Sequence, residues 1–299
     1  MKLNAVILSI LLVAYSLTSI KGNPELFDQE KLLEHLETLS SDAYEGRLTG
    51  EKGNALARTY IIDHFKESGI APFGKAFEQP FEFTRGEMAY KANNVLGFVK
   101  GTTYPRDFIV ISAHHDHLGK HGDAIYNGAD DNASGVAALL AFAEYFAANP
   151  PKHSVILAAF DAEELGLEGA KYFMTQTEDI NIVLNVNMDM IGRSTKDELY
   201  VVGSRYHKSL GKMMAQFENP TSSKLLVGHD GADQKEDWTY ASDHSPFHMK
   251  EIPFLYFGNE DHPAYHKPTD TFDAITPEFY KNAVTIIISV FKAADQIEF

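Results

Sequence analysis

The feature of this sequence that most constrains its fold is a series of short, continuously apolar segments separated by helix-like stretches. Six such segments are predicted to be β-strands, at residues 93–99, 107–113, 154–160, 181–188, 198–203 and 252–257. Strands that are apolar on both faces must be covered on both faces, which is typical of parallel sheets joined by crossover helices. The pattern therefore predicts an α/β fold: a single three-layer α/β/α domain with a mostly parallel, mixed central sheet.

Apolar residues at helical spacing mark the segments that would cover this sheet. The predicted helices lie at residues 32–39, 55–65, 134–149, 166–176, 206–217 and 277–294. No repeat and no low-complexity linker interrupts the pattern. The chain has 299 residues, of which 44% are hydrophobic, and this suffices for one large core. We therefore expect residues 23–299 to form one domain.

The first 22 residues differ from the rest of the chain. Lys2 precedes a 13-residue apolar run from Ala5 to Leu17, and a short polar tail ends at Lys21-Gly22. A charged start, a short apolar centre and a polar tail are typical of a secretory signal peptide. An uncleaved anchor is the alternative, because no A-x-A cleavage site is obvious. We predict a signal peptide at residues 1–22 and an exported protein, periplasmic or secreted, with no stable membrane association after cleavage.

Charge and cysteine content narrow the chemistry. The formal net charge is −16, and it becomes −18 without residues 1–22, which carry Lys2 and Lys21 and no acid. So acidic a chain is not expected to bind nucleic acid or an anionic membrane. The sequence has no cysteine, which excludes thiol nucleophiles, cysteine-ligated zinc and iron–sulfur clusters.

Histidine, aspartate and glutamate follow four of the predicted strands at the point where each ends. These residues lie at 114–117, 161–164, 189 and 262–266, and the segment "NGADDNASG" at 127–135 adds further acids. Ligands bind at the carboxyl ends of parallel strands, so we expect these side chains to converge. Nitrogen and oxygen donors without sulfur favour zinc or, less often, manganese or cobalt. Five or more ligands favour two ions, which together can clamp a water and a carbonyl oxygen.

The order and spacing of the motifs resemble those of a known family. The motifs are "AYEGRLTGEKGN", "SAHHDHLG", "NGADDNASG", "DAEELGLEGA", "NVNMDMIGR", "ASDHSPF" and "HPAYHKPTDT". Together they resemble the co-catalytic di-zinc aminopeptidases of the bacterial leucyl-aminopeptidase type, a family that also includes glutaminyl cyclases and glutamate carboxypeptidases. The resemblance covers nearly all of residues 23–299. It implies a zinc metallo-aminopeptidase, a hydrolase that removes the amino-terminal residue from peptides with a free amino terminus.

The resemblance also implies five ligands for two zinc ions per chain. One zinc would be bound by His114 and Asp189, and the other by Glu164 and His266. Asp131, the second acid of "ADDN", would bridge the two ions.

Three further residues receive roles from the same resemblance. Glu163 would be the general base that takes a proton from the metal-bridging water and returns it to the leaving amine, and two divalent charges would offset its repulsion with Glu164. Asp116 would hydrogen-bond the imidazole of His114 and fix its tautomer. Tyr265 resembles the position that in some relatives donates to the developing oxyanion.

Other polar residues near the motifs have structural interpretations. Each of Asp130, Asn132 and Asp161 precedes a predicted helix start and is interpreted as an N-cap at least as readily as a site residue. A turn cap is expected at Asp270, and the start of a helix at Asp243-His244. Arg193 is expected to pair with local acids. We expect three further histidines at the rim of the site: His115, His117 and His121.

Two alternatives from other functional classes stay open. One is a glutaminyl-peptide cyclotransferase with a single zinc. Relatives of that type show Trp-His where this chain has Tyr265-His266, and "DDH" where it has residues 242–244, "SDH". Both differences favour the peptidase. The other alternative is a non-catalytic metal-binding relative, but such proteins lose the base or a ligand first, and none is missing here. The sequence makes no prediction of the oligomeric state or of side-chain preference.

Overall fold

The computed structural model describes residues 26–299, so the predicted signal peptide lies outside the described residues. Its centre is a nine-stranded sheet in the order β1-β3-β7-β4-β8-β11-β9-β10, with β2 paired to β3. The middle of this sheet is parallel. It consists of β7 (His153–Phe160), β4 (Tyr104–His114), β8 (Asn181–Met188) and β11 (Phe254–Gly258). The predicted mixed sheet with parallel strands is confirmed.

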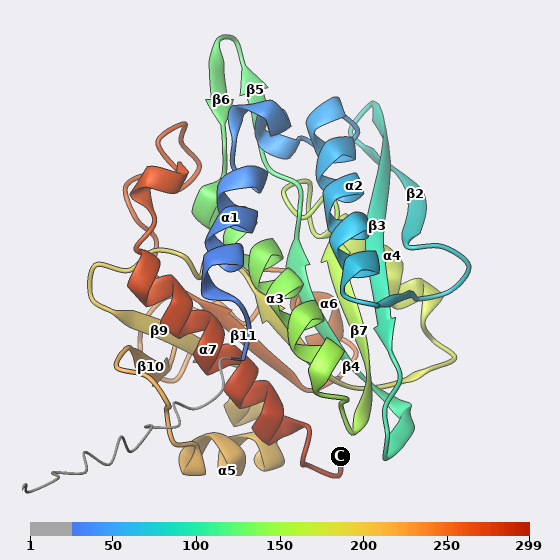
Figure 1. The fold of residues 1–299 in the computed structure, drawn as a ribbon, viewed down its shortest axis with the longest axis vertical. Coiled ribbons are helices and arrows are strands. Elements are labelled where there is room, and N and C mark those ends of the chain that lie inside the picture. Colours follow the sequence, from blue (N-terminus) through green and yellow to red (C-terminus); the bar gives the residue numbers. More distant parts are fainter. Residues whose placement is uncertain (1–25) are drawn as a thin grey trace, which may run out of the picture.

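Antiparallel pairing occurs towards both edges of the sheet. On one side β3 (Met88–Val99) runs antiparallel to β7, to β2 (Glu78–Arg85) and to β1 (Ala71–Pro72). On the other side β9 (Glu198–Val202) is antiparallel to β11 and parallel to β10 (Lys224–Val227). A separate hairpin, β5 (Gly119–His121) and β6 (Ala124–Tyr126), projects at the top of the molecule (Figure 1).

Helices cover both faces of the sheet, which confirms the three-layer architecture (Figure 1). The larger core lies beneath α1 (Gln29–Leu39), α2 (Lys52–Glu67), α3 (Gly135–Ala148), α5 (Lys208–Gln216) and α7 (Pro277–Ala294). The opposite face packs against α4 (Glu168–Gln176) and α6 (Ser245–His248). Four short helical turns complete the described chain: η1 (Asp42–Arg47), η2 (Ala129–Ser134), η3 (Ser204–Tyr206) and η4 (Phe272–Ala274).

Helix α3 is buried along almost its whole length, because it lies between the sheet and the helices outside it. Leu139, Leu140 and Phe142 are each at most 3% exposed. Burial of each such side chain stabilises the fold by about 1.5–3 kcal/mol. This helix begins directly after η2, so its packing fixes the position of the acids in that turn.

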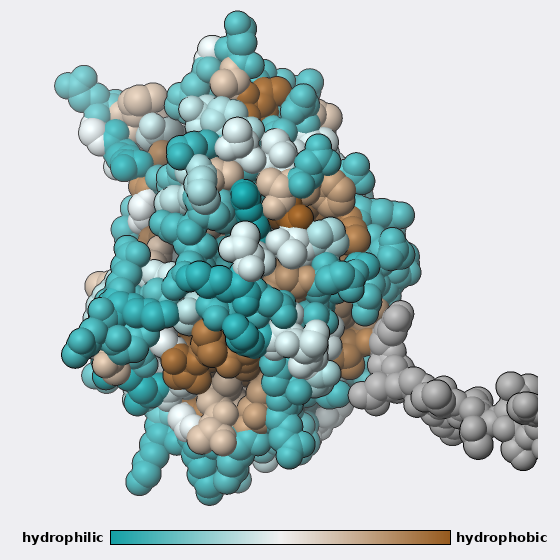
Figure 2. Space-filling model, turned by 90° about the vertical axis from the view of Figure 1, so that its left-hand side faces the viewer, coloured by the Kyte–Doolittle hydropathy of each residue, from teal (hydrophilic) through white to brown (hydrophobic). Residues whose placement is uncertain are grey.

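The surface in Figure 2 is mostly hydrophilic, with scattered hydrophobic patches, in keeping with the acidic composition. Among the described residues, no helix combines the length and apolarity that a membrane crossing requires.

Candidate active site and metal centre

The carboxyl-terminal edge of the parallel strands brings together the five predicted metal ligands. His114 is the last residue of β4, Asp189 follows β8, and Glu164 follows β7. Asp131 lies in η2, and His266 in the loop after β11. Four of these ligands, up to 152 positions apart in the sequence, meet because the strands that precede them are neighbours in the sheet, and Asp131 reaches the same edge from η2.

Asp131 lies between the other ligands with one carboxylate oxygen turned to each side. Its Oδ1 is 3.3 Å from Nε2 of His114, and that nitrogen is 3.2 Å from Oδ1 of Asp189. Its Oδ2 is 3.1 Å from Nε2 of His266, which lies 3.4 Å from Oε2 of Glu164. This is the arrangement that a carboxylate bridging two cations requires.

Two groups of donor atoms in the described chain are compact enough to hold a metal ion. One comprises His114, Glu163 and Asp189, and the other comprises His117, Asp131 and Glu164, with the donor atoms of each group within 4.8 Å of one another. Both offer only nitrogen and oxygen, in surroundings that are largely shielded from water. Such donor sets fit zinc.

The carboxylates of the site have strongly shifted pKa values. Burial, together with Asp189 and other neighbouring acids, raises the pKa of Glu163 well above its usual range although His114 opposes this. Burial would also raise the pKa of Asp131, but His117, His114 and His266 outweigh it and hold the pKa well below its usual range. Adjacent acids thus differ in proton affinity, as acid–base chemistry requires.

A tight turn after β7 aims the adjacent glutamates. Ala162 has a φ of 59°, and the carbonyl of Glu163 accepts the N–H groups of Gly166 and Leu167. The carboxylate of Asp116 accepts the N–H groups of Glu163, at 3.1 Å, and Glu164, at 3.3 Å. The turn is therefore held by an acid that follows β4, the neighbouring strand of the sheet.

The contact between Asp116 and His114 uses the main chain. Nδ1 of His114 donates to the backbone carbonyl of Asp116 at 3.1 Å, whereas the carboxylate Oδ1 lies 3.6 Å away. The sequence predicted a hydrogen bond between Asp116 and this imidazole without specifying the acceptor atom. Because the carboxylate binds the N–H groups of the glutamate turn, the carbonyl orients the imidazole instead.

Arg47 holds the loops of the site from beneath. Its fully buried guanidinium donates to four backbone carbonyls at 2.7–3.0 Å. The acceptors are Leu39, His115, Asn127 and Gly128. Burial lowers the pKa of Arg47 to about 10, so the side chain stays charged at neutral pH. The motif "EGR" thus joins the segment after β4 to the segment before Asp131, a role that sequence reasoning missed.

The acids that were interpreted as N-caps tie loops together. Asp130 accepts from the N–H of Gly192 and from Nε2 of His262. Asp161 accepts from Thr49, Asn54 and the N–H groups of residues 93 and 162. For these two acids the cap interpretation is wrong, because buried loops compete for their oxygens.

Asn132 and Asp270 do bind helical backbone. The side-chain oxygen of Asn132 accepts the N–H of Gly135 at 2.9 Å, at the start of α3, and its amide donates to the carbonyl of Met188. Asp270 accepts the N–H groups of Asp130 and Asp131 at 3.0–3.1 Å. Asp270 thereby fixes the backbone of Asp131, the predicted bridging ligand.

The rim expectation is wrong for two of the three histidines. His115 and His117 are both fully buried, while His121 is exposed. Nδ1 of His115 donates to the carbonyl of Phe160 at 2.6 Å, which is a structural contact. Nδ1 of His117 lies 2.7 Å from Oε1 of Glu164, so His117 belongs to the site. Its position three residues after His114 was the signal in the sequence.

Two tyrosines approach the donor groups. The ring of Tyr265 stacks on that of His266 at a centroid distance of 3.9 Å, and burial raises its pKa. Tyr256, on β11, also lines the pocket and was not singled out from the sequence. Burial, with Asp189 and other acids, raises its pKa well above the usual range. Both phenols therefore keep their protons and can donate hydrogen bonds.

The segment "SDH" lies just behind this site. His244 is the N-cap residue directly before α6, is fully buried, and hydrogen-bonds the carbonyl of Trp238 at 2.9 Å through Nε2. Asp243 is also fully buried, and neither of its carboxylate oxygens has a hydrogen-bond partner among the described residues. Burial, together with Asp116 and Asp189, raises the pKa of Asp243 well above its usual range.

The donor groups open into a cavity of about 390 Å³. The following residues line it: Arg85, Asp131, Glu163, Glu164, Gly166, Asp189, Met190, Glu236, Trp238, Ala241, Tyr256, Asn259, Asp261, Tyr265 and His266. Four of the predicted ligands and the predicted base thus face one space, together with several apolar side chains. This cavity is the candidate substrate pocket.

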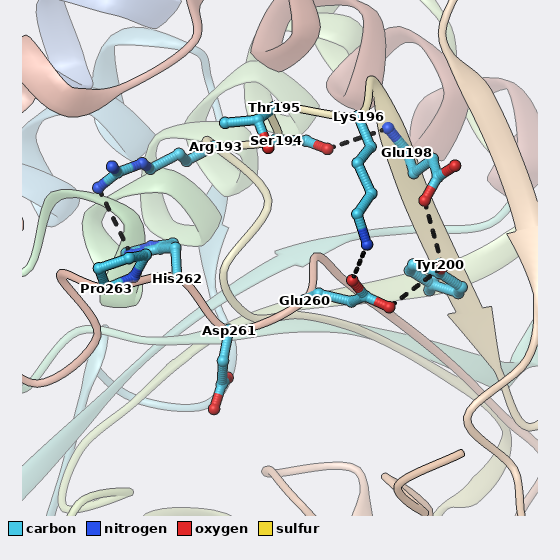
Figure 3. Close-up of a pocket in the computed structure, with 10 residues that line it drawn as sticks. All are labelled: Arg193, Ser194, Thr195, Lys196, Glu198, Tyr200, Glu260, Asp261, His262 and Pro263. Atoms are coloured by element: carbon cyan, nitrogen blue, oxygen red, sulfur yellow. Dashed lines mark hydrogen bonds and ion pairs between the residues drawn. The ribbon is translucent and has the colours of Figure 1, made fainter. Parts of the chain in front are cut away.

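A second cavity, of about 200 Å³, shares Asp261 with the first (Figure 3). Within it, Lys196 lies 2.6 Å from Glu260, which also contacts the hydroxyl of Tyr200 (Figure 3). Arg193 points towards His262, with Nη1 3.5 Å from Nδ1, and forms no ion pair with a described acid (Figure 3). The expectation that Arg193 pairs with local acids is therefore wrong.

Comparison with known proteins decides the family. Residues 94–291 match the family model described as "Peptidase family M28". The chain belongs to peptidase family M28. Among curated relatives, this M28 chain is 27% identical to aminopeptidase YwaD of Bacillus subtilis over 229 residues, which are 72% of this chain and 48% of the relative. A "probable zinc metalloprotease" of Pyrenophora teres is 28% identical, over 60% of this chain and 41% of the relative. The chain spans about half the length, or less, of the curated relatives it matches.

Solved structures agree with the fold of this M28 chain. An aminopeptidase from Aneurinibacillus superposes with a TM-score of 0.70 at 19% identity, covering 89% of this chain and 93% of that one. A glutaminyl cyclase from Bacteroides thetaiotaomicron superposes with a TM-score of 0.68 at 17% identity, covering 88% and 97%. At such identities the likeness shows the fold alone.

Proposed function

We propose that this M28 protein is a zinc-dependent aminopeptidase that hydrolyses the first peptide bond of substrates with a free amino terminus. The observation that carries the proposal is the position of Asp131, which turns one oxygen to His114 and the other to His266. Such a bridging carboxylate favours two zinc ions per chain. The names of the relatives, an aminopeptidase and zinc metalloproteases, support the same assignment.

The residues present divide into two ligand sets. His114, Asp189 and Oδ1 of Asp131 would hold one zinc, and Glu164, His266 and Oδ2 of Asp131 would hold the other. Zinc, when bound, supplies Lewis-acid polarisation of the scissile carbonyl and lowers the pKa of water towards 7. The protein's part is to keep both sets of donors in place before the substrate arrives.

Glu163 is proposed as the general base. It lies beside His114 and Asp189, and its neighbour Glu164 belongs to the other donor group, so it faces the space between the two sets. Its carboxylate would take the proton of the attacking water and deliver it to the departing amine nitrogen. A base of raised pKa is suited to both transfers, an effect worth roughly 10²–10⁴ in rate. Tyr265 is proposed to donate a hydrogen bond from its phenol to the developing oxyanion.

The acidic pocket suits the positive charge of a peptide's amino terminus. Met190, Trp238 and Tyr256 are each at most 8% exposed and form an apolar surface beside the donor groups. This surface is proposed to receive the side chain of the amino-terminal residue. Export of the protein, to the periplasm or the medium, remains a proposal that rests on the sequence of residues 1–22 alone.

The test combines metal analysis with a release assay on the purified chain. We expect two zinc ions per chain, and release of amino acids from amino-acid nitroanilides and free peptides but not from amino-terminally blocked peptides. Glu163→Gln should lower kcat by at least about 10²-fold while the zinc content stays at two. Glu168→Gln, at the start of α4, is the matched control because the side chain of this partly exposed residue forms its ion pair with Lys171. Wild-type turnover by Glu163→Gln would refute the base assignment. One zinc, no cleavage and ring closure of an amino-terminal glutamine would identify a cyclase instead.

A further inference from the structure

Arg85 is the one lysine or arginine among the residues that line the candidate substrate pocket. It is the last residue of β2, at the exposed tip of the β2–β3 hairpin. Its Nη1 lies 3.4 Å from the backbone carbonyl of Glu164, and it forms no ion pair with a carboxylate of the described chain. A guanidinium with most of its donors free therefore faces a pocket that is otherwise lined by acids and apolar groups.

The hairpin that carries Arg85 is anchored to the catalytic turn. Phe81 stacks on Tyr172 of α4, with ring centroids 5.0 Å apart and an interplanar angle of 15°. Phe81 also belongs to a buried cluster with Ala162, the residue directly before Glu163. Backbone pairing continues to the tip, where Arg85 pairs with Met88. The same packing thus holds the hairpin and the turn of the two glutamates.

The two ends of the pocket differ in character. Towards β8 and β11 the lining includes the buried apolar side chains of Met190, Trp238 and Tyr256. Towards β7 the lining residues are Arg85 and Gly166, both exposed. The amino-terminal side chain suits the buried apolar surface, whereas the rest of a peptide needs an exposed part of the pocket. The chain that follows the scissile bond would therefore leave past Arg85.

We propose that Arg85 binds a carboxylate on the leaving side of the substrate. The proposal rests on the aminopeptidase function proposed above. The side chain of Glu164 supplies a donor oxygen of the candidate metal centre, and its backbone carbonyl lies beside Arg85. The guanidinium is therefore separated from the donor atoms by about the length of one residue. Two residues of extended peptide span about 7 Å, which brings the end of a dipeptide or tripeptide to this distance. The planar guanidinium matches a carboxylate with two parallel hydrogen bonds.

The carboxylate can come from two sources, which matched substrates distinguish. Leu-Gly compared with Leu-Gly-amide tests the terminal carboxylate of a short peptide. Leu-Asp-amide compared with Leu-Asn-amide tests an acidic side chain next to the scissile bond. The measured quantity is the ratio of kcat/KM within each pair, for the zinc-loaded enzyme. We expect a preference of about tenfold for the carboxylate in at least one pair. Because Arg85 is exposed, this preference should shrink as ionic strength rises.

Variants of the hairpin complete the test. Arg85→Ala should bring the preferred ratio close to one, Arg85→Glu should invert it, and Arg85→Lys should keep part of it. Lys91→Ala is the matched control, because Lys91 lies on the same hairpin and its exposed side chain forms an ion pair with Glu82 across it. If Arg85 merely offsets the charge of Glu163 and Glu164, its loss changes both members of each pair equally, and the proposal is overturned.

Leucyl-nitroanilide, which has no carboxylate, separates the two proposals. Cleavage of this substrate together with ratios near one in the wild-type enzyme would overturn the role of Arg85 alone. No release of an amino acid from any of these substrates, or from nitroanilides of other amino acids, would overturn the aminopeptidase proposal as well. The salt dependence of the wild-type ratio needs no variant, so a ratio that stays constant as ionic strength rises would overturn the proposal even if the substitutions disturb folding.

Discussion

Nδ1 of His117 lies 2.7 Å from Oε1 of Glu164, and the imidazole is fully buried. Nε2 of the same ring has no hydrogen-bond partner among the described residues. The other oxygen of Glu164, Oε2, faces His266 at 3.4 Å. One oxygen of this glutamate is thus held by a histidine, and the second remains free for a cation.

This geometry predicts that His117 sets the affinity of one of the two metal sites. His117→Ala should weaken binding of the second zinc about 10–100-fold, because Glu164 loses the group that orients it. His117→Asn, whose amide can still donate to Glu164, should recover part of that loss. The measurements are zinc content after dialysis and the dissociation constant from competition with a chelator. His121→Ala serves as control, since this histidine is exposed. Unaltered affinity in His117→Ala would show that Glu164 needs no support.

Removal of metal should lower the stability of the protein. Asp131, Asp189 and Glu164 lie close together with little exposure to water, and divalent cations offset their repulsion. Free zinc at a thousandfold excess over its dissociation constant should raise the free energy of unfolding of the chelated protein by about 4 kcal/mol. Urea unfolding with and without zinc measures this difference. Equal stability would mean that these acids hold no structural cation.

Loss of Arg47 should destabilise the whole site. Arg47→Ala leaves four buried carbonyls without their donor, and each unsatisfied group costs about 1–3 kcal/mol. Arg47→Lys keeps the charge but cannot reach all four acceptors, so it should be intermediate. Thermal or urea unfolding gives the ranking. Arg106→Ala is a suitable comparison, because Arg106 is exposed. If Arg47→Ala lowers the free energy of unfolding by less than about 1 kcal/mol, the proposed role of Arg47 is wrong.

Acid should destabilise the protein partly through His244. Burial lowers the pKa of His244 to about 3 in the folded chain, compared with about 6.5 when unfolded. The folded state therefore binds fewer protons than the unfolded state between these values. The contribution of His244 is complete above pH 6.5 and is lost as pH falls towards 3. Near pH 5, protonation of His244 in the unfolded state should lower the free energy of unfolding by about 1.4 kcal/mol for each unit by which the pH falls.

The variant His244→Phe isolates this contribution. Its ring can keep the stacking with Phe254 and Tyr256, whose centroids lie 4.9 and 4.4 Å from that of His244. The free energy of unfolding of the chelated proteins, measured between pH 7 and 5, should fall less steeply in the variant than in the wild type. Identical slopes would mean that His244 is not kept neutral by the fold.

Local patterns in the sequence were sufficient for the central strands and the main helices. Strand β8, for example, was expected at residues 181–188 and occupies Asn181–Met188. The β2–β3 hairpin was predicted only in part, from residue 93 onwards, because its outer half is exposed and alternates polar and apolar residues without a continuous apolar run. Periodicity marks a strand clearly only where burial forces it.

By itself, the sequence determined which residue types stand at the ends of the parallel strands, and with them the family and the donor chemistry of the site. The tertiary structure decided how those residues are held. It buried His117 against Glu164, and it turned the carboxylate of Asp116 to the glutamate turn. It also lets Arg47 donate hydrogen bonds to carbonyls as far as 81 positions away in the sequence, and it places Arg85 in the lining of the pocket. These contacts join residues distant in sequence, and only the packing of strands and loops brings them together.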